Sequence, residues 1–425
     1  MNKFAKMVSV AALAVGGTLA AGAVQAADVS FMSFTYAEEA NTKTVQGVLD
    51  AFKTADGLTV EPLGFAWGDM QKNIFLRARS KSLPDIAQLS ERWLPTFVSL
   101  DTLVDLNTVY GKEKLEAAFA PDALAMGNID GKQYALPLIS GTIGMVANKE
   151  VLEKAGVSKA PETLQEFKDA LVAVRDKVPN SVPYTMATKN NGSILIDFML
   201  WNWVHGGRII NDEGKVVVDS DAGRAALQFM VDLVKDRLAA PEIDRPDSRR
   251  LMAQGASAFY FDAPQTRTFL RDFSGKGVDF DKNVLPMTTP VLKQGDKPVS
   301  VQWGHLLVQF APGATAASDA PADKFLAYLT SDVVQTDYPL KMSALPVTKS
   351  AREAVSGDAY LAAWSKATGD ARRNEVGIWS NAAELTQIVG EEAQAAMLGQ
   401  KSADDAIKTM QGRLTESMAS AKKAN

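Results

Sequence analysis

The sequence predicts an α/β protein built as two lobes. Short apolar segments of strand length alternate with amphipathic segments of helix length, the pattern of β–α–β units around a largely parallel sheet. The chain has 425 residues, more than one hydrophobic core normally supports, so two lobes or domains are expected. Hydrophobic residues make up 46% of the chain and charged residues 22%, which is typical of a globular protein.

The first 26 residues predict an export signal. Lys3 and Lys6 give a positive start, and no further charge occurs before Asp28. The apolar run between Lys6 and Asp28 is rich in Ala and Gly and ends in small residues, which places cleavage after Ala26. The run is also close to membrane-spanning length, so a retained anchor is the alternative. The chain has no cysteine for lipid attachment, and we expect the mature protein to be free in the periplasm.

The charge pattern argues against two classes of partner. The full chain carries a net charge of −5, and removal of Lys3 and Lys6 with the signal makes it more acidic. No cluster of Lys and Arg is present, so nucleic acid and anionic membrane surfaces are not expected partners. The absence of cysteine excludes disulfides, and a core of this size needs none.

The first part of the mature chain alternates strands and helices. Each strand is a short apolar run, and each helix shows apolar residues at spacings of three and four. Strands are expected at 29–34, 58–65 and 85–89, with one helix carrying Val45, Val48, Leu49 and Phe52 and ending near Gly57, and a second helix over 69–80.

Two long extended segments interrupt this alternation, and each is expected to cross between the lobes. The first comprises residues 133–139 and 144–148, and the second comprises 297–310. Between them, Thr163 and Glu166 form a capping box that opens a helix over 164–177. Further elements are a helix capped by Ser220 that runs to about 238, a strand at 257–261, and helices at 324–329, 381–398 and from 402 onward.

The sequence lacks the common catalytic signatures. It contains no Gly-x-Ser-x-Gly elbow, phosphate-binding loop, dinucleotide fingerprint or His-Glu-x-x-His motif. Its two histidines, His205 and His305, are far apart in the sequence, so neither a metal site nor a cofactor is expected. A carboxylate pair for glycoside hydrolysis meets only in the fold, so a periplasmic carbohydrate-active enzyme stays an alternative.

Several motifs, taken in order, resemble one protein family. They are Trp67-Gly-Asp69 leading to the segment 76–86 with its Pro-Asp-Ile ending, Asn128-Ile-Asp-Gly-Lys-Gln-Tyr-Ala-Leu-Pro137, Met145-Val-Ala-Asn-Lys149, the segments 160–167 and 204–207, and 397–406 near the end. In this order the chain resembles the extracellular solute-binding proteins of ABC importers, in the cluster that includes maltose-binding protein. Ala147 stands where that family usually has Tyr before Asn-Lys.

The resemblance implies a two-lobe periplasmic binding protein fold. Each lobe is expected to hold a central, mostly parallel sheet flanked by helices, with a multi-segment hinge and the solute in the cleft. The N-terminal lobe is expected to comprise 27–140 plus about 301–345, and the C-terminal lobe about 141–300 plus 346–425. The implied partners are a carbohydrate and inner-membrane ABC permease subunits, and a monomer is expected.

A sugar site needs planar aromatics for the C–H faces and polar groups for the hydroxyl rim. Trp67 follows a predicted strand end, where open α/β sheets place ligands. Trp303 lies in the second crossover, and Trp379 precedes a long helix where the resemblance implies a stacking aromatic. The predicted ligand contacts are Tyr36, Trp67, Gln88, Glu91, Arg92, Asn191, Asp262, Trp303 and Trp379.

Packing is the competing interpretation for some of these positions. Arg92 lies where a helix start is equally expected, and Trp201 and Trp203 share a helical pattern that favours the core. The leading functional hypothesis is a carbohydrate receptor. The alternatives are a non-sugar solute on the same fold, the carbohydrate-active enzyme, and a receptor that also serves a chemosensor.

Overall fold

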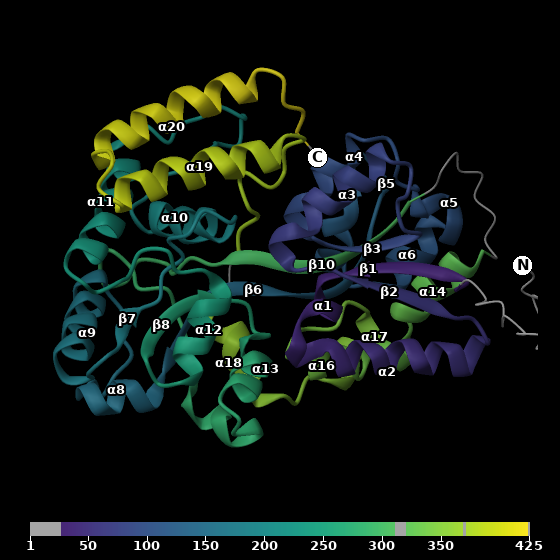
Figure 1. Ribbon diagram of the computed structural model, residues 1–425, viewed down its shortest axis with the longest axis horizontal. Helices are drawn as coiled ribbons and strands as arrows, with labels where there is room; N and C mark the ends of the chain where they lie inside the picture. Colours follow the sequence, from purple (N-terminus) through teal and green to yellow (C-terminus); the bar gives the residue numbers. More distant parts are fainter. Residues whose placement is uncertain (1–26, 311–319, 369–370, 424–425) are drawn as a thin grey trace, which may run out of the picture.

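The computed structural model describes residues 27–310, 320–368 and 371–423, and they form two α/β lobes side by side (Figure 1). This confirms the predicted fold class. The predicted signal, residues 1–26, lies outside the described residues. Among the helices of the described part, none combines the length and apolar character that a bilayer crossing requires.

One eight-stranded sheet runs through both lobes in the order β2-β1-β3-β10-β6-β8-β7, with β9 paired to β6. Parallel ladders join β1 to β2 and β3 in one lobe and β7 to β8 in the other. The antiparallel ladders involve the crossing strands β6 and β10. The strands are β1 Val29–Ser33, β2 Val60–Gly64, β3 Ile86–Ser90, β6 Leu136–Asn148, β7 Val182–Tyr184, β8 Ser257–Asp262, β9 Val284–Met287 and β10 Val301–Gln309.

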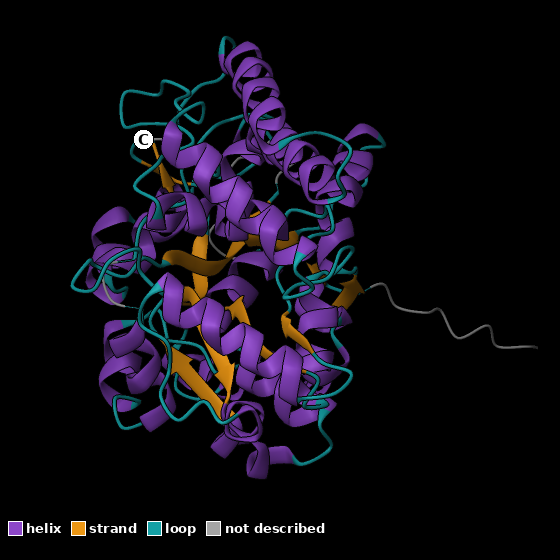
Figure 2. Cartoon of the chain, turned by 90° about the vertical axis from the view of Figure 1, so that its left-hand side faces the viewer, coloured by secondary structure: helices purple, strands orange, loops and turns teal. Residues whose placement is uncertain are grey.

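Helices cover the strands on both sides (Figure 2). The lobe of β1 to β3, called the first lobe, carries a small hairpin of β4 (Asn128–Ile129) and β5 (Lys132–Gln133). Its helices are α1 Phe34–Ala37, α2 Glu39–Asp56, η1 Trp67–Asp69, α3 Met70–Arg79, η2 Glu91–Trp93, α4 Leu94–Val98, α5 Leu106–Tyr110, α6 Lys112–Ala118, α7 Pro121–Leu124, η3 Ala125–Gly127, α14 Pro321–Leu329, α15 Asp332–Gln335, α16 Tyr338–Lys341 and α17 Lys349–Ala354.

The second lobe, that of β7 to β9, holds the longest run of buried helix. Every residue of α10 from Ser193 to Trp203 is buried, and Trp201 packs against Phe167, Tyr184 and Phe261. The core interpretation of Trp201 and Trp203 is therefore confirmed. The helices of this lobe are α8 Lys149–Ala155, α9 Leu164–Lys177, α10 Ser193–Val204, α11 Asp221–Lys235, α12 Arg245–Ala253, α13 Thr266–Phe273, η4 Gly277–Asn283, α18 Ala359–Ala367, α19 Ala382–Met397 and α20 Ala403–Met418.

Capping residues in the sequence predicted the starts of several helices correctly. The capping box of Thr163 and Glu166 forms as predicted and opens α9, and Ser220 caps α11 through the N–H of Gly223. The first crossover differs from the prediction, because its two expected strands form one continuous strand, β6. Residues 140–143 stay extended since they pair with β10, a partner far away in the sequence.

β6 and β10 cross between the lobes side by side, and the chain crosses once more in its last third. α17 packs on the first lobe, where Arg352 binds both carboxylate oxygens of Asp122 at 2.7 and 2.8 Å. Asp358, at the start of α18, instead binds Arg267 of the second lobe. These contacts favour a third crossing after Ala354, rather than at the predicted 346, and the lobe boundaries stay a prediction.

Substitution of Gly127 tests how closely the first lobe is packed around this residue. A Cβ added there would lie 2.0 Å from the carbonyl oxygen of Ala135, so the Gly127→Ala variant must push backbone aside. We expect it to lose about 1–3 kcal/mol of unfolding free energy, the usual cost of overpacking. Gly47→Ala is the matched control, because it lies in α2 with open space around it and should gain up to about 1 kcal/mol. Denaturant unfolding measures both, and equal effects would contradict this account of Gly127.

Candidate functional site

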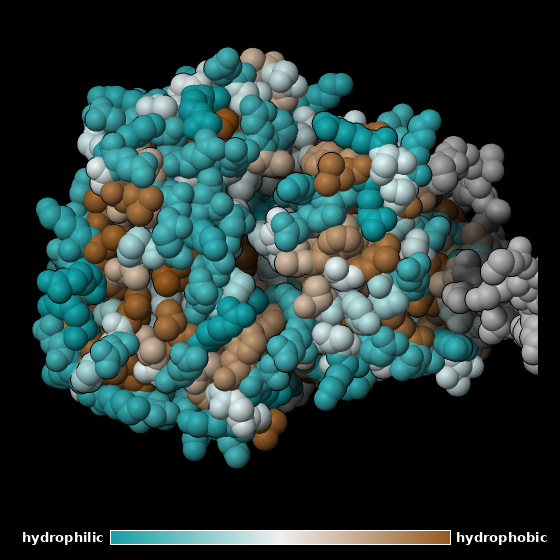
Figure 3. All heavy atoms as spheres, in the orientation of Figure 1, coloured by the Kyte–Doolittle hydropathy of each residue, from teal (hydrophilic) through white to brown (hydrophobic). Residues whose placement is uncertain are grey.

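Two neighbouring cavities lie between the lobes, and Arg92 lines both. The small cavity has a volume of about 30 Å³, room for about one water molecule. The large cavity has about 300 Å³, the lower end of the range for small-molecule sites. The surface is hollowed between the two lobes (Figure 3). The large cavity is lined by Trp67, Gly68, Gln71, Arg92, Trp93, Asn190, Asn191, Gly192, Ala382, Ala383, Thr386 and Gln387.

The first lobe contributes residues that follow strand ends. Trp67 lies in η1 after β2, and Glu91, Arg92 and Trp93 form η2 directly after β3. Carboxyl ends of parallel strands meet at one edge of a sheet, so these two segments face the same cleft. The second lobe contributes the turn before α10 and the first turns of α19.

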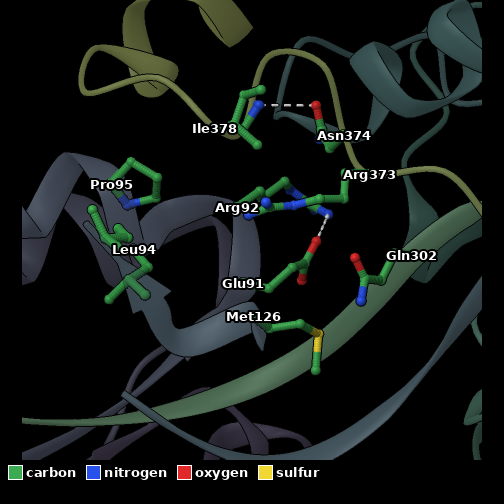
Figure 4. Close-up of a pocket in the computed structure, with 11 residues that line it drawn as sticks. Glu91, Arg92, Leu94, Pro95, Met126, Gln302, Arg373, Asn374 and Ile378 are labelled. Atoms are coloured by element: carbon green, nitrogen blue, oxygen red, sulfur yellow. Dashed lines mark hydrogen bonds and ion pairs between the residues drawn. The ribbon is translucent and has the colours of Figure 1, made fainter. Parts of the chain in front are cut away.

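The small cavity is closed by a segment from the far end of the chain (Figure 4). Residues 373–378, between α18 and α19, lie over Glu91 and Arg92. Gln302 of β10 also lines the cavity, together with Leu94, Pro95, Met126 and Ile129 of the first lobe. A Cβ added at Gly377 would lie only 2.5 Å from the Cβ of Arg92, and one at Gly192 would lie 3.6 Å from the Trp67 ring. The two lobes therefore touch at both points.

One carboxylate oxygen of Glu91 is hydrogen-bonded within the protein, and the other has no hydrogen-bond partner. Its Oε2 accepts hydrogen bonds from the Ser90 hydroxyl at 2.9 Å and from the Gly304 N–H at 3.2 Å. Its Oε1 is buried without a hydrogen-bond partner and lies 3.9 Å from Nη1 of Arg92. Burial raises the pKa of Glu91, opposed by the charge of Arg92.

Arg92 is positioned mainly by stacking. Its guanidinium lies 4.9 Å from the centre of the Trp67 ring, which in turn lies 4.8 Å from the Trp93 ring. The side chain is only 9% exposed, and Nη1 has no hydrogen-bond partner. Burial lowers the pKa of Arg92, opposed by Glu91. The cation–π contact leaves these N–H groups free to bind something in the cavities.

Four buried polar atoms without partners belong to residues that line the two cavities. They are Glu91 Oε1, Arg92 Nη1, Gln71 Nε2 and Asn374 Nδ2. A buried polar group left unpaired costs about 1–3 kcal/mol, and charged groups cost more. A molecule carrying several hydroxyl groups in the large cavity would meet Gln71 and Arg92 while its C–H face lies against Trp67, whereas Glu91 Oε1 and Asn374 Nδ2 belong to the small cavity. The described residues contain no cluster of three acidic or histidine side chains that could hold a metal.

Behind the cavities runs a row of packed rings from β10 to η2. Trp303 lies 4.7 Å from His305, His305 lies 4.7 Å from Phe34, and Phe34 lies 5.9 Å from Trp93. Trp303, His305 and Phe34 are buried and line neither cavity, so they support the cleft wall, whereas Trp93 also lines the large cavity.

The amide of Gln88 orients His305 within this row. The N–H of Thr35 can only donate, and it bonds Gln88 Oε1, so the oxygen of this amide is identified. Gln88 Nε2 then donates to His305 Nδ1 at 2.9 Å, and the ring proton must be on Nε2 of His305. Burial, with Arg92 and Arg249 nearby, lowers the pKa of His305 to about 3.

The structure brings together four of the nine predicted ligand residues. Trp67, Glu91, Arg92 and Asn191 line the two cavities. Gln88 and Trp303 lie directly behind them, and the Gln88 amide is fully occupied by bonds to Ser33, Thr35 and His305.

The other three predicted residues lie elsewhere. The Tyr36 hydroxyl donates to Gln46 on α2 at 3.3 Å. Both oxygens of Asp262 bind Arg249, at 2.8 and 3.0 Å, so this carboxylate positions an arginine instead of facing the cavities. Trp379 turns into the second lobe, where its indole N–H donates to the Glu375 carbonyl and its ring lies over Gly214.

Sequence reasoning missed Gln71, Asn374 and Gln387. Gln71 had a usable signal, because it lies four residues after Trp67 at the start of a helix and therefore faces the same way. Asn374 and Gln387 carry no such signal in the sequence. Their place in the cleft depends on how the chain after the third crossing lies against the first lobe.

Comparison with known proteins gives one family and one fold. Residues 47–369 match the model of the family described as bacterial extracellular solute-binding protein. A putative binding protein of Brucella abortus is 22% identical over 212 residues, 49% of this chain and 51% of the relative, so the chain spans about half the length of such curated relatives. The diacetylchitobiose-binding protein of Streptomyces coelicolor is 20% identical over 83% of this chain and 81% of its own.

The solved structures confirm the two-lobe fold. An ABC transporter solute-binding protein of Thermotoga lettingae, bound to α-D-tagatose, superposes with a TM-score of 0.80 at 20% identity. The match covers 92% of this chain and 99% of that one.

The low pKa of His305 predicts an acid-sensitive fold. Between pH 6.5 and about 3 the unfolded chain binds a proton that the folded chain excludes, so His305 makes stability fall as pH falls. We expect this group to account for about 1.5 kcal/mol of the loss between pH 6.5 and 5. His305→Gln should remove that share, and His205→Gln, a change at the other histidine, should keep it. Denaturant unfolding at both pH values measures the difference, and identical pH dependence in wild type and His305→Gln would disprove it.

Proposed function

The chain belongs to the bacterial extracellular solute-binding protein family, and from that membership we propose that it captures a carbohydrate between its lobes in the periplasm and delivers it to an inner-membrane ABC permease. The predicted export signal and the absence of cysteine support a soluble periplasmic form.

The observation that carries the carbohydrate proposal is the lining of the large cavity. It combines the Trp67 ring with side-chain amides from both lobes and the guanidinium of Arg92. Planar aromatics suit the C–H faces of a sugar, and amides both donate to and accept from hydroxyl groups. The relatives named for sugars, such as the diacetylchitobiose-binding protein, point in the same direction.

Ligand capture is coupled to the approach of the lobes. Arg92 of the first lobe meets Gly377, and Trp67 meets Gly192 of the second lobe. A ligand in the large cavity touches both sides at once, so it favours the closed form through contacts that an open form lacks. Permease subunits would then distinguish closed from open by the relative placement of the lobes.

A sugar panel tests the proposed ligand class. The mature chain is titrated with monosaccharides, disaccharides and longer oligosaccharides, and tryptophan fluorescence and melting temperature are followed. We expect at least one saccharide to change both, because Trp67 and Trp93 line the cavity. Amino acids and polyamines serve as comparison solutes, and a response to them alone would show that the carbohydrate assignment is wrong.

Gly377→Ala tests whether lobe approach is needed for binding. The added methyl group meets the Arg92 backbone, at 3.0 Å from its Cα, and overpacking of this kind costs about 1–3 kcal/mol in the closed form. We expect saccharide affinity to fall about 10- to 100-fold. At the same ligand concentration, the radius of gyration of the variant should lie closer to the ligand-free value than that of wild type.

The control for this variant is Gly412→Ala, which lies in α20 with open space around it. It should bind like wild type. Unchanged affinity and unchanged small-angle scattering in Gly377→Ala would refute the closure mechanism.

A further inference from the structure

The large cavity has features of an anion site, and this inference rests on the proposed carbohydrate function. We propose that the solute is an acidic saccharide, whose carboxylate, phosphate or sulfate group binds between the N-terminal ends of α10 and α19, beside Arg92. The neutral part of the sugar then lies against Trp67.

Two long helices begin at this cavity. α10 has 12 residues and α19 has 16, and Gly192, Ala382 and Ala383 at their starts line the wall. The first N–H groups of a helix lack intrahelical acceptors, and the helix dipole makes that end positive. Helix starts are therefore common places for bound anions.

Neither helix has a side-chain cap. Gly192 has no side chain, and the Asn381 amide instead donates to the carbonyl and hydroxyl of Ser417 at 3.0 and 2.7 Å. Two local acceptors remain: Asn191 Oδ1 receives the Ser193 N–H at 3.3 Å, and the Trp379 carbonyl receives the Ala382 N–H at 3.0 Å. Most side chains that normally satisfy a helix start are thus missing where the two helices face the cavity.

Arg92 gives an independent indication of a ligand. Its side chain is nine-tenths buried and lines this cavity, and its Nη1, which lies 3.9 Å from Glu91, has no hydrogen-bond partner. Gln71 Nε2, also at the cavity wall, is a second donor without a partner. A guanidinium satisfied by an oxyanion gains charge-assisted hydrogen bonds, about twice as strong as those to a neutral hydroxyl.

The acidic groups nearby leave room for a ligand anion. No carboxylate lines the large cavity. Glu91 lies on the other side of Arg92 at 3.9 Å, in the small cavity, and offsets part of its charge. Asp244 pairs with Lys189 at 3.6 Å, and Glu384 in the first turn of α19 is exposed and outside the cavity wall.

The test compares sugars that differ only at carbon 6. Galactose, galacturonate, galactose 6-phosphate and galactose 6-sulfate, with the corresponding glucose series, are titrated into the mature chain by calorimetry. We expect at least one acidic sugar to bind at least tenfold more tightly than its neutral counterpart, with an affinity that falls as salt rises. The carboxylate, phosphate and sulfate arms identify the anion.

Two variants locate the anion. Arg92→Gln should reduce the preference for the acidic sugar to less than about threefold, while Arg79→Gln, which removes an exposed arginine of α3, should retain it. Ala383→Asp places a carboxylate at the start of α19, a stabilising position for the helix. It should fold at least as well as wild type and still lose the preference, so the test does not depend on the stability of the Arg92 variant.

The outcomes separate the two proposals. Equal or tighter binding of the neutral sugars would overturn the acidic-saccharide inference and leave the carbohydrate function intact. An acidic preference that survives both Arg92→Gln and Ala383→Asp would overturn the assigned site. Binding of citrate or inorganic phosphate with no saccharide bound would overturn the carbohydrate function, and no binding of either class would overturn both.

Discussion

The pairing of β6 with β10 is the constraint on which the site depends. These two strands run side by side from one lobe to the other, and each pairs with strands of a lobe as well as with its neighbour. Glu91 is tied to this pair, because its Oε2 accepts the N–H of Gly304 in β10. Gly304 has to be small, since a Cβ there would lie 2.7 Å from the Met126 side chain and 3.0 Å from the Ile139 carbonyl oxygen. The crossing thereby sets the position of the binding groups.

The buried carboxylates of this protein differ in how completely they are bonded. Asp262 binds Arg249 with both oxygens, and Glu375 accepts from the indole of Trp203 and the N–H groups of Ile209 and Ile210. In these groups the carboxylate is satisfied inside the protein, which is what a structural ion pair requires. Glu91 and Arg92 are adjacent in sequence, yet 3.9 Å separates their charged groups and each keeps an atom without a hydrogen-bond partner. An incompletely bonded pair at a cavity is suited to a ligand.

The sequence indicated the fold class and most long elements because those depend on local signals. The capping box of Thr163 and Glu166 begins a helix through contacts within four residues. Side-chain direction depends instead on distant partners. Trp379 was expected to face the cleft, but its ring is packed over Gly214. Gly214 lies in the same lobe but far away in the sequence. Asp262 ends a strand as predicted, yet Arg249 of the preceding helix occupies its carboxylate. Trp67, Glu91 and Arg92 line the cavities, as expected of residues that follow strand ends, and their role as ligand contacts stays a prediction.

Polar atoms without partners would raise the free energy of the form in which the lobes touch, unless a ligand pairs them. In this arrangement of the lobes Glu91 Oε1, Arg92 Nη1, Gln71 Nε2 and Asn374 Nδ2 are buried without partners. Each of these atoms that stays without a partner on closure would cost about 1–3 kcal/mol, whereas in an open cleft water would satisfy it. A change from mostly open to mostly closed requires about 5.5 kcal/mol of differential affinity. A ligand in the large cavity that pairs Gln71 and Arg92 would supply part of that difference, and its other contacts with both lobes would add to it. Polar groups that bind a solute in this cleft would therefore also favour the approach of the lobes.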